Sequence, residues 1–175
     1  MADVEVVAAR LEDRGALENL IQLYVHDFSE HWAGTPNGEL QDDGRFAPYP
    51  LGGYWEEPER IPLLFRRQGR LIGFALINAH SHAERPLDHA VAEFFVVRKH
   101  RRDGVGQTAA HAIFAAYPGR WEAAVARRNT AALAFWRRAV ASCPGVSAIE
   151  EVDMASEVWN GPVLCFGVAA SAASA

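Results

Sequence analysis

The sequence lacks the features that mark membrane proteins and secreted disulfide scaffolds. Its 175 residues include only two cysteines, with no C-x-x-C spacing, so neither a disulfide framework nor a cysteine-based zinc site is expected. No apolar run approaches the roughly 18 residues of a membrane helix, and the first residues lack the basic and apolar regions of a secretory signal. We therefore expect a cytoplasmic protein with no membrane partner.

The sequence also lacks an excess of positive charge, since 22 Asp and Glu outnumber 17 Lys and Arg and the formal net charge is −5. A general nucleic-acid binder would carry a basic surface over much of one face, so no nucleic-acid partner is expected. The bases are concentrated instead, with four in residues 98–102 and four more in residues 127–138. This concentration favours an anion bound at one place.

Half of the residues are hydrophobic, which is enough for the core of one domain of this length. We expect residues 1–169 to form a single domain and residues 170–175 to form a disordered tail. Apolar residues at helical spacing predict a helix over 17–28, and two apolar runs around Gln68-Gly69 predict a β-hairpin. Residues 29–53 are rich in Gly, Pro, Asp and Asn and are expected to be irregular.

The second half of the chain alternates strands and helices. A strand over 91–97 precedes a glycine loop and a helix that ends at Pro118-Gly119, and a strand over 121–128 precedes a helix capped by Asn129. Two more strands are expected around 149–154 and 163–168. The order predicts a mixed α/β fold.

The glycine loop "RRDGVG", residues 101–106, follows a strand and opens a helix. That order directs free backbone N–H groups and the positive end of the helix dipole at one point, which makes an anion site. Two alternatives stay open: a solvated glycine turn, and a dinucleotide fold, because "GVGQTA" satisfies G-x-G-x-x-A. The dinucleotide fold fits less well, since six residues separate Val97 from Gly104.

Two motifs together resemble the GCN5-related N-acetyltransferase (GNAT) superfamily. The first is residues 101–106, which match Arg/Gln-x-x-Gly-x-Gly/Ala, and the second is Asn129 with Ala132, Phe135 and Trp136 on the following helix. The resemblance covers about residues 4–168. It implies an α/β (α+β) fold with a mostly antiparallel twisted sheet of about six or seven strands, split between the fourth and fifth, and about four helices.

The resemblance also implies a co-substrate and the residues that would bind it. Acetyl coenzyme A (acetyl-CoA) would donate an acetyl group to a primary amine by direct attack in a ternary complex, with no metal. Its pyrophosphate would lie on the loop amides and its pantetheine arm in the split. The residues expected to bind it are Phe95, Val96, Val97, Arg101, Arg102, Asp103, Gly104, Val105, Gly106, Gln107 and Asn129.

Glu93 and Trp136 are the candidate catalytic residues. "AEFFV" around Glu93 looks like the "EDFFV" of spermidine/spermine acetyltransferases, so Glu93 would be the general base; a solvent-exposed carboxylate is the alternative. Trp136 stands where the family usually has a tyrosine acid, and an indole N–H is only a hydrogen-bond donor. Trp136 would pack beside the thioester or in the core, with Tyr54, Tyr117, water or the amine's own proton supplying the acid.

The acceptor is expected to be a small molecule or a peptide. Acids in and after the irregular segment suggest a cationic amine, or else a solvated surface; they are Glu30, Glu39, Asp42, Asp43, Glu56, Glu57 and Glu59. His80, His82 and His89 would be a proton relay, a zinc site or a plain polar loop.

Other functions stay open as well. Dimerisation is common in the superfamily, so a homodimer is compatible with the resemblance. The loss of the usual tyrosine favours a regulator that binds coenzyme A (CoA) without catalysis, and a nicotinamide-dependent oxidoreductase is the third alternative.

Overall fold

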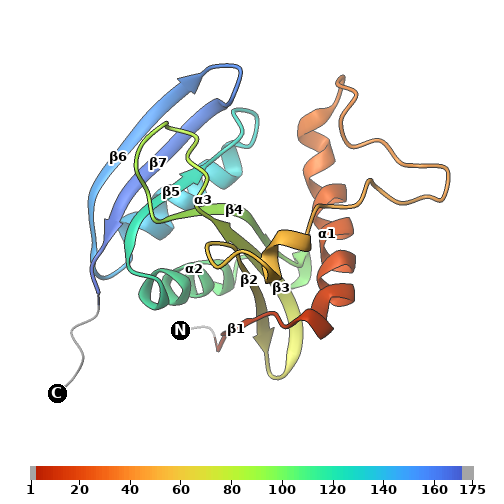
Figure 1. The fold of residues 1–175 in the computed structure, drawn as a ribbon, viewed down its shortest axis with the longest axis horizontal. Helices are drawn as coiled ribbons and strands as arrows, with labels where there is room; N and C mark the ends of the chain where they lie inside the picture. Colours follow the sequence, from red (N-terminus) through yellow and green to blue (C-terminus); the bar gives the residue numbers. More distant parts are fainter. Residues whose placement is uncertain (1–2, 171–175) are drawn as a thin grey trace.

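Seven strands form one twisted sheet with helices on both faces (Figure 1). The computed structural model describes residues 3–170, so the expected tail, apart from Ala170, lies outside the described residues. The strands are β1 (Glu5–Ala8), β2 (Ile61–Arg67), β3 (Arg70–Asn78), β4 (His89–Val96), β5 (Gly119–Ala124), β6 (Val146–Ala155) and β7 (Asn160–Val168). Their order is β1-β2-β3-β4-β5-β7-β6, and only β4 and β5 run parallel. The predicted mixed, mostly antiparallel sheet is confirmed.

Helices cover the two faces of the sheet unequally. α1 (Arg14–Phe28) packs on one face, in a core that contains Leu17 and Phe95. α2 (Val105–Ala116) and α3 (Thr130–Ala141) pack on the other face, over a larger core (Figure 1). The sheet therefore separates α1 from the two later helices.

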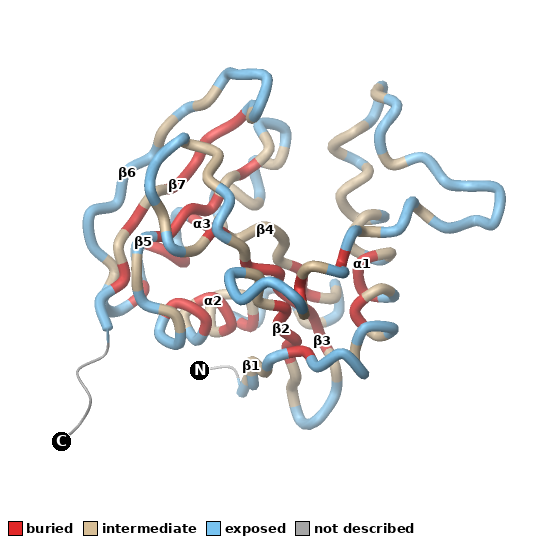
Figure 2. The backbone as a smooth tube through the Cα atoms, viewed as in Figure 1, coloured by how far each residue is buried: buried red, intermediate tan, exposed pale blue. Residues whose placement is uncertain are grey.

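About four helices were expected, and the described residues contain three α-helices. Between α1 and β2 the chain forms only short 3-10 turns at Ser29–Trp32 and Gly52–Trp55, because its many Gly, Pro, Asp and Asn residues favour turns over helix. Much of this segment is exposed (Figure 2). Within residues 3–170, no helix has the length and apolarity needed to cross a membrane.

The β2–β3 hairpin was predicted correctly. Gln68 and Gly69 have φ of 51° and 72°, as a two-residue hairpin turn with two left-handed residues requires. Arg67 pairs with Arg70 across the turn. A short-range signal was therefore enough to fix this pairing.

The split between β4 and β5 is confirmed by the strand register. The two strands pair only over His89–Val91 and Trp121–Ala123. β5 ends at Ala124, four residues before the predicted end. Residues 126–129 form a turn instead, in which the N–H of Asn129 donates to the carbonyl of Ala126 (2.8 Å). β4 continues to Val96 without a partner on that side, so the strands diverge.

A bulge in β4 sets which side chains face α1. Leu76 pairs with Glu93 and Ile77 pairs with Val91, so Ala92 is the extra residue. After the bulge, Phe95 lies in the core beneath α1, whereas Phe94 packs against the core beneath α2 and α3. Since side chains alternate along a strand, Glu93 faces α1.

Candidate active site

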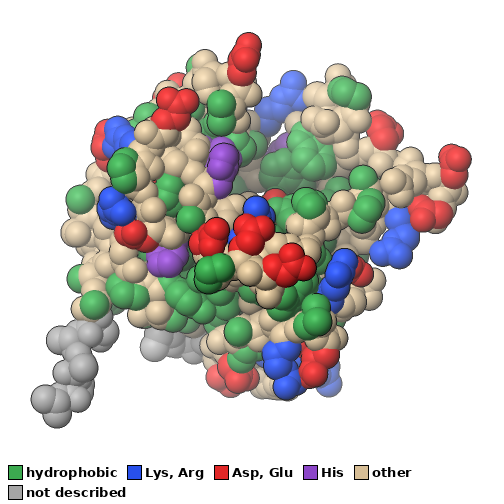
Figure 3. Space-filling view, in the orientation of Figure 1, with side chains coloured by type: hydrophobic (Ala, Val, Ile, Leu, Met, Phe, Trp, Pro, Cys, Tyr) green, Lys and Arg blue, Asp and Glu red, His purple; other side chains and the backbone are tan. Residues whose placement is uncertain are grey.

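A cleft of about 630 Å³ opens where β4 and β5 diverge. We call it the split cleft. Its walls come from α1, from β4 and the glycine loop, and from α3, including Tyr24, Phe95 and Trp136. The space-filling view shows the surface hollowed between the β6–β7 side and the α1 side of the molecule (Figure 3).

The glycine loop lies at one end of the split cleft and has the geometry of an anion site. Arg102 and Gly104 have φ of 71° and 76°, and α2 begins directly afterwards with no side-chain cap. The first backbone bond of the helix runs from the N–H of Thr108 to the carbonyl of Gly104 (2.9 Å), so the N–H groups of residues 105–107 precede it. These donors and the helix dipole favour a bound phosphate.

The two loop glycines meet different surroundings. A Cβ on Gly104 would have no atom within 4 Å, whereas a Cβ on Gly106 would lie 3.1 Å from the ring of Phe135. Gly104 therefore borders open space that a phosphate could fill. Gly106 is small because α2 packs closely on α3.

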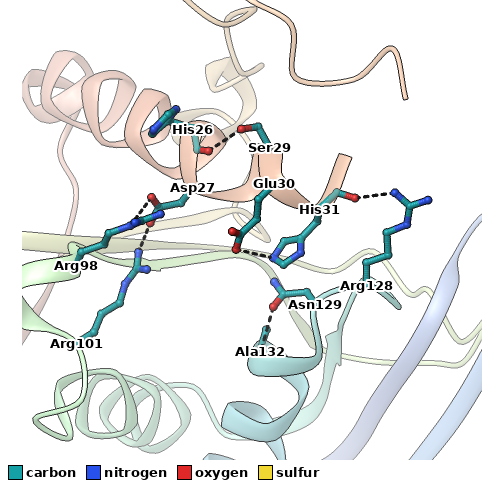
Figure 4. A network of polar contacts seen from close by, with 10 residues as sticks. All are labelled: His26, Asp27, Ser29, Glu30, His31, Arg98, Arg101, Arg128, Asn129 and Ala132. Carbon is teal, nitrogen blue, oxygen red and sulfur yellow. Dashed lines mark hydrogen bonds and ion pairs between the residues drawn. The ribbon is translucent and has the colours of Figure 1, made fainter. Parts of the chain in front are cut away.

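Asp27 of α1 holds two of the arginines at the cleft (Figure 4). Arg98 Nε donates to Asp27 Oδ1 (2.8 Å), and Arg101 Nη2 donates to Asp27 Oδ2 (2.5 Å). Arg101 Nε also donates to the carbonyl of Val96 (2.6 Å), and its guanidinium lies over the ring of Phe95. Arg101, expected to assist the pyrophosphate, is thus fixed between β4 and α1.

Most of the expected cofactor-binding residues line the split cleft, and three do not. Val105 is fully buried in the core beneath α2. Asp103 lies 3.6 Å from Arg67, and the N–H of Val97 donates to the carbonyl of Ile72 (2.9 Å). Those three can contribute only their backbone or a structural contact. The residues that line the cleft are Phe95, Val96, Arg101, Arg102, Gly104, Gly106, Gln107 and Asn129.

Asn129 caps α3 as predicted. Its Oδ1 accepts a hydrogen bond from the N–H of Ala132 (3.0 Å; Figure 4), which leaves the side-chain NH₂ group to donate to a ligand in the cleft. The neighbouring Arg128 donates to the carbonyl of Ala33 (3.1 Å), so residues that follow α1 are tied to the far wall.

Asn129→Ala is expected to weaken acetyl-CoA binding and to lower the free energy of unfolding by about 1 kcal/mol through the lost cap. Asn129→Asp is the matched variant, because aspartate caps as well as asparagine but cannot donate. We expect Asn129→Asp to keep the stability and lose affinity, measured by thermal denaturation and calorimetric titration. Wild-type affinity in Asn129→Asp would show that Asn129 is a cap alone.

Glu93 is partly buried on the α1 face of β4. Burial raises the pKa of its carboxyl, and the hydroxyls of Tyr24 and Tyr49, which lie close to it, lower that pKa in part. The alternative of a solvated surface carboxylate does not match this environment. A carboxylate that is costly to ionise is a better proton acceptor than an exposed one.

Trp136 is a core aromatic that also lines the cleft. Only 6% of it is exposed, and its ring packs against Phe94 and Phe135, with centroids 5.1 and 4.9 Å away. The other expected acids lie elsewhere: Tyr117 packs against His89, and the Tyr54 hydroxyl is buried with no hydrogen-bond partner among residues 3–170. Neither tyrosine lines the split cleft.

The three histidines do not form one cluster. The rings of His80 and His82 are 5.2 Å apart, and His82 packs against Trp159 (4.5 Å). His89 instead packs against Trp121 and Tyr117. The described part of the chain contains no group of three or more His, Cys, Asp or Glu residues placed to hold a metal ion.

The seven acids expected to attract a cation do not gather either. Glu30 lines the split cleft, Asp43 lines a separate pocket beside α1, and Glu57 pairs with Arg60. The structure therefore brings no acidic ring together from these residues. Glu93 is a separate acid, and it lies beside Tyr24, which lines the split cleft.

Sequence reasoning missed Tyr24, Tyr49 and Asp27. Tyr24 belongs to the apolar stripe of α1, so its spacing indicated a core residue. Its hydroxyl was the one sign that it could also contact a polar group. Tyr49 and Asp27 come from segments whose position relative to β4 no local pattern reveals. Glu122 was missed as well: it is buried and accepts hydrogen bonds from Ser81 Oγ (2.7 Å) and the N–H of His82 (2.8 Å), which fix the β3–β4 loop.

Comparison with known proteins defines the class. The model of the Acetyltransferase (GNAT) family matches residues 17–140, and the chain belongs to this family. No curated protein matches the sequence.

Solved structures share the fold at low sequence identity. An acetyltransferase from Thermus thermophilus has 17% identity and a TM-score of 0.60, covering 97% of this chain and 100% of its own. The aminoglycoside acetyltransferase AAC(6')-Ib, in complex with coenzyme A and kanamycin, has 12% identity and a TM-score of 0.60, covering 94% of each chain. The yncA protein of Salmonella typhimurium, solved with acetyl-CoA, has 15% identity and a TM-score of 0.54, covering 94% of this chain and 92% of its own.

Proposed function

We propose that the protein transfers the acetyl group of acetyl-CoA to a primary amine of a small molecule or peptide, by direct attack in a ternary complex. One observation carries the proposal: the split cleft has a loop shaped for phosphate at one end, and its wall includes Tyr24, which lies beside the partly buried carboxylate of Glu93. The family supports acetyl transfer in general, and the amine acceptor is our inference from Glu93.

The residues of the cleft fit acetyl-CoA along its length. The N–H groups of residues 105–107 would bind the pyrophosphate, and Arg102 would add positive charge. β4 has no strand partner on the β5 side beyond Val91, so an amide-rich pantetheine arm could pair there like an added strand. The NH₂ group of Asn129 would donate from the opposite wall. When bound, acetyl-CoA supplies an activated thioester.

Glu93 would make the amine reactive. Only a neutral amine can attack a carbonyl carbon, so its proton must be accepted by a base. Glu93 is a base only when ionised, and burial raises the pKa of its carboxyl. As the pH falls through that raised pKa, Glu93 becomes protonated and kcat/KM is expected to fall with it.

A carboxylate beside aromatic rings also suits a cationic acceptor. An ammonium group is attracted both by a negative charge and by the face of a tyrosine ring, and Glu93 has Tyr24 and Tyr49 beside it. An aminoglycoside acetyltransferase of the same fold was solved with kanamycin, which supports an amine-bearing acceptor.

A homodimer, a cytoplasmic location and a single domain over residues 1–169 stay predictions.

Two measurements test the proposal. Calorimetric titration should show binding of acetyl-CoA and CoA and none of nicotinamide cofactors. A thiol-release assay over a panel of polyamines, aminoglycosides, amino acids and peptides should show turnover with at least one amine. If acetyl-CoA binds but no acceptor leads to thiol release, the alternative of a CoA-binding regulator is favoured. Trp136, which stands where the family usually has a tyrosine, also favours that alternative.

A further inference from the structure

Acetyl transfer needs an acid for the leaving group as well as a base for the amine. When the C–S bond breaks, the sulfur of CoA leaves with its electron pair and requires a proton. Trp136 cannot supply one, and Tyr54 and Tyr117 lie outside the split cleft. A donor must therefore be sought among the other groups in the walls of the cleft.

Tyr24 is the tyrosine in those walls. It lies near the C-terminal end of α1, and its ring is packed edge-on against Phe74 and Phe95, with centroids 5.9 and 6.0 Å away. Phe28 packs at 5.7 Å on a third side. These contacts fix the ring, and its hydroxyl lies close to the carboxyl of Glu93. Tyr24 thus contacts both the split cleft and the candidate base.

We infer that Tyr24 is the general acid of this reaction, donating its hydroxyl proton to the departing thiolate and taking a proton back from Glu93. The inference rests on the proposed function, because it requires Glu93 to accept the proton of the amine. It assigns the acid to α1, on the opposite face of the sheet from α3 and Trp136.

Glu93, Tyr24 and solvent together account for every proton of the reaction, and the electron pairs balance. Glu93 takes one proton from the acceptor ammonium, the amine nitrogen forms a C–N bond with the acetyl carbon, and the C–S bond breaks. The sulfur keeps the bonding electron pair and takes the proton of Tyr24. Glu93 then returns its proton to the Tyr24 phenolate, so the products are a protonated thiol and an amide, and a second proton of the nitrogen goes to solvent.

The electrostatics of the pair link the two proton transfers. Burial raises the pKa of Tyr24, and the negative charge of Glu93 raises it further. Once Glu93 holds the proton of the amine, that second cause is gone and Tyr24 becomes a stronger acid. Proton uptake by the base thus prepares the donor for the next step.

Tyr24→Phe tests the inference, because it removes the hydroxyl and keeps the packed ring. The kcat of thiol release should fall by about 10²-fold or more, while calorimetric affinity for CoA stays at the wild-type value. Wild-type kcat should be slower in D₂O, and this solvent isotope effect should decrease toward one in the variant, because no side-chain proton then moves with the sulfur. A merely structural role would lower kcat without changing the isotope effect.

Tyr117→Phe is the matched control, since it removes a tyrosine hydroxyl outside the split cleft and should keep wild-type kcat. An active wild type together with an unimpaired Tyr24→Phe variant would overturn the acid and leave the proposed function intact. Loss of CoA affinity in Tyr24→Phe, or an unchanged isotope effect, would also overturn it. A wild type that releases no thiol with any amine would instead contradict the proposed function itself.

Discussion

Gly104→Val is expected to abolish measurable binding of acetyl-CoA while the sheet stays folded. Gly104 has a φ of 76°, and no atom lies within 4 Å of where its Cβ would be. A branched side chain would enter the open space in front of the N–H groups of residues 105–107. It would also disfavour the left-handed backbone that directs those groups at the ligand. Calorimetric titration measures the affinity, and circular dichroism checks the fold.

Gly44→Val is the control that introduces the same backbone strain away from the candidate phosphate site. Gly44 has a φ of 77° and equally open surroundings, but it lies in the irregular segment between α1 and β2. We expect Gly44→Val to lose a similar amount of stability and to bind acetyl-CoA normally. Unchanged affinity in Gly104→Val, or an equal loss in both variants, would contradict the assignment of the loop to the pyrophosphate.

Gly106 is a less informative position for the same test. A Cβ there would press on the ring of Phe135, so Gly106→Val would disturb the packing of α2 on α3 together with any ligand contact. The sequence motif treats the two glycines alike. Only the structure shows that one borders open space and the other a neighbouring helix.

The features predicted correctly from the sequence are those that short-range chemistry determines. The turn at Gln68-Gly69 and the cap at Asn129 both depend on a residue's own backbone preference or on a partner three residues away. The glycine loop belongs to the same group, because a strand, a loop and a helix N-terminus are consecutive in the chain. Such features need no knowledge of the rest of the fold.

The surroundings of Arg101 and Glu93 could not be predicted in this way. Arg101 is paired with Asp27, 74 residues earlier, and Glu93 has its tyrosine neighbours from α1 and from the irregular segment. Those contacts depend on how α1 packs across the sheet. For the histidines, closeness in sequence was misleading. His89 is close to His82 along the chain, but it packs against Trp121 and does not join His80 and His82.

Glu93→Gln is expected to lower kcat by about 10²–10⁴-fold, the range that general base catalysis contributes. Glutamine keeps the shape of the side chain and removes its basicity. Affinity for acetyl-CoA should hardly change, because Glu93 faces α1 and does not line the split cleft. Steady-state kinetics with the best amine of the panel and calorimetric titration with acetyl-CoA measure the two quantities.

Stability measurements distinguish lost chemistry from lost structure in this variant. Since burial raises the pKa of Glu93 in the folded protein, its contribution to stability is complete below the pKa of the unfolded chain. That contribution is lost as the pH rises through the folded value. Glutamine cannot ionise, so the variant should lack this loss and be at least as stable as the wild type at neutral pH. A variant that unfolds instead would show that the carboxylate holds Tyr24 and Tyr49 in place.

The pH profile then decides which role Glu93 has. In the wild type, kcat/KM should rise through a region set by Glu93 and the amine together, and in Glu93→Gln only the ionisation of the amine should remain. A loss confined to KM for the amine would mean that Glu93 anchors a cation without moving a proton. Wild-type activity with an unaltered profile would exclude both roles. It would direct attention to His80 and His82, which lie together on the β3–β4 loop that Glu122 fixes.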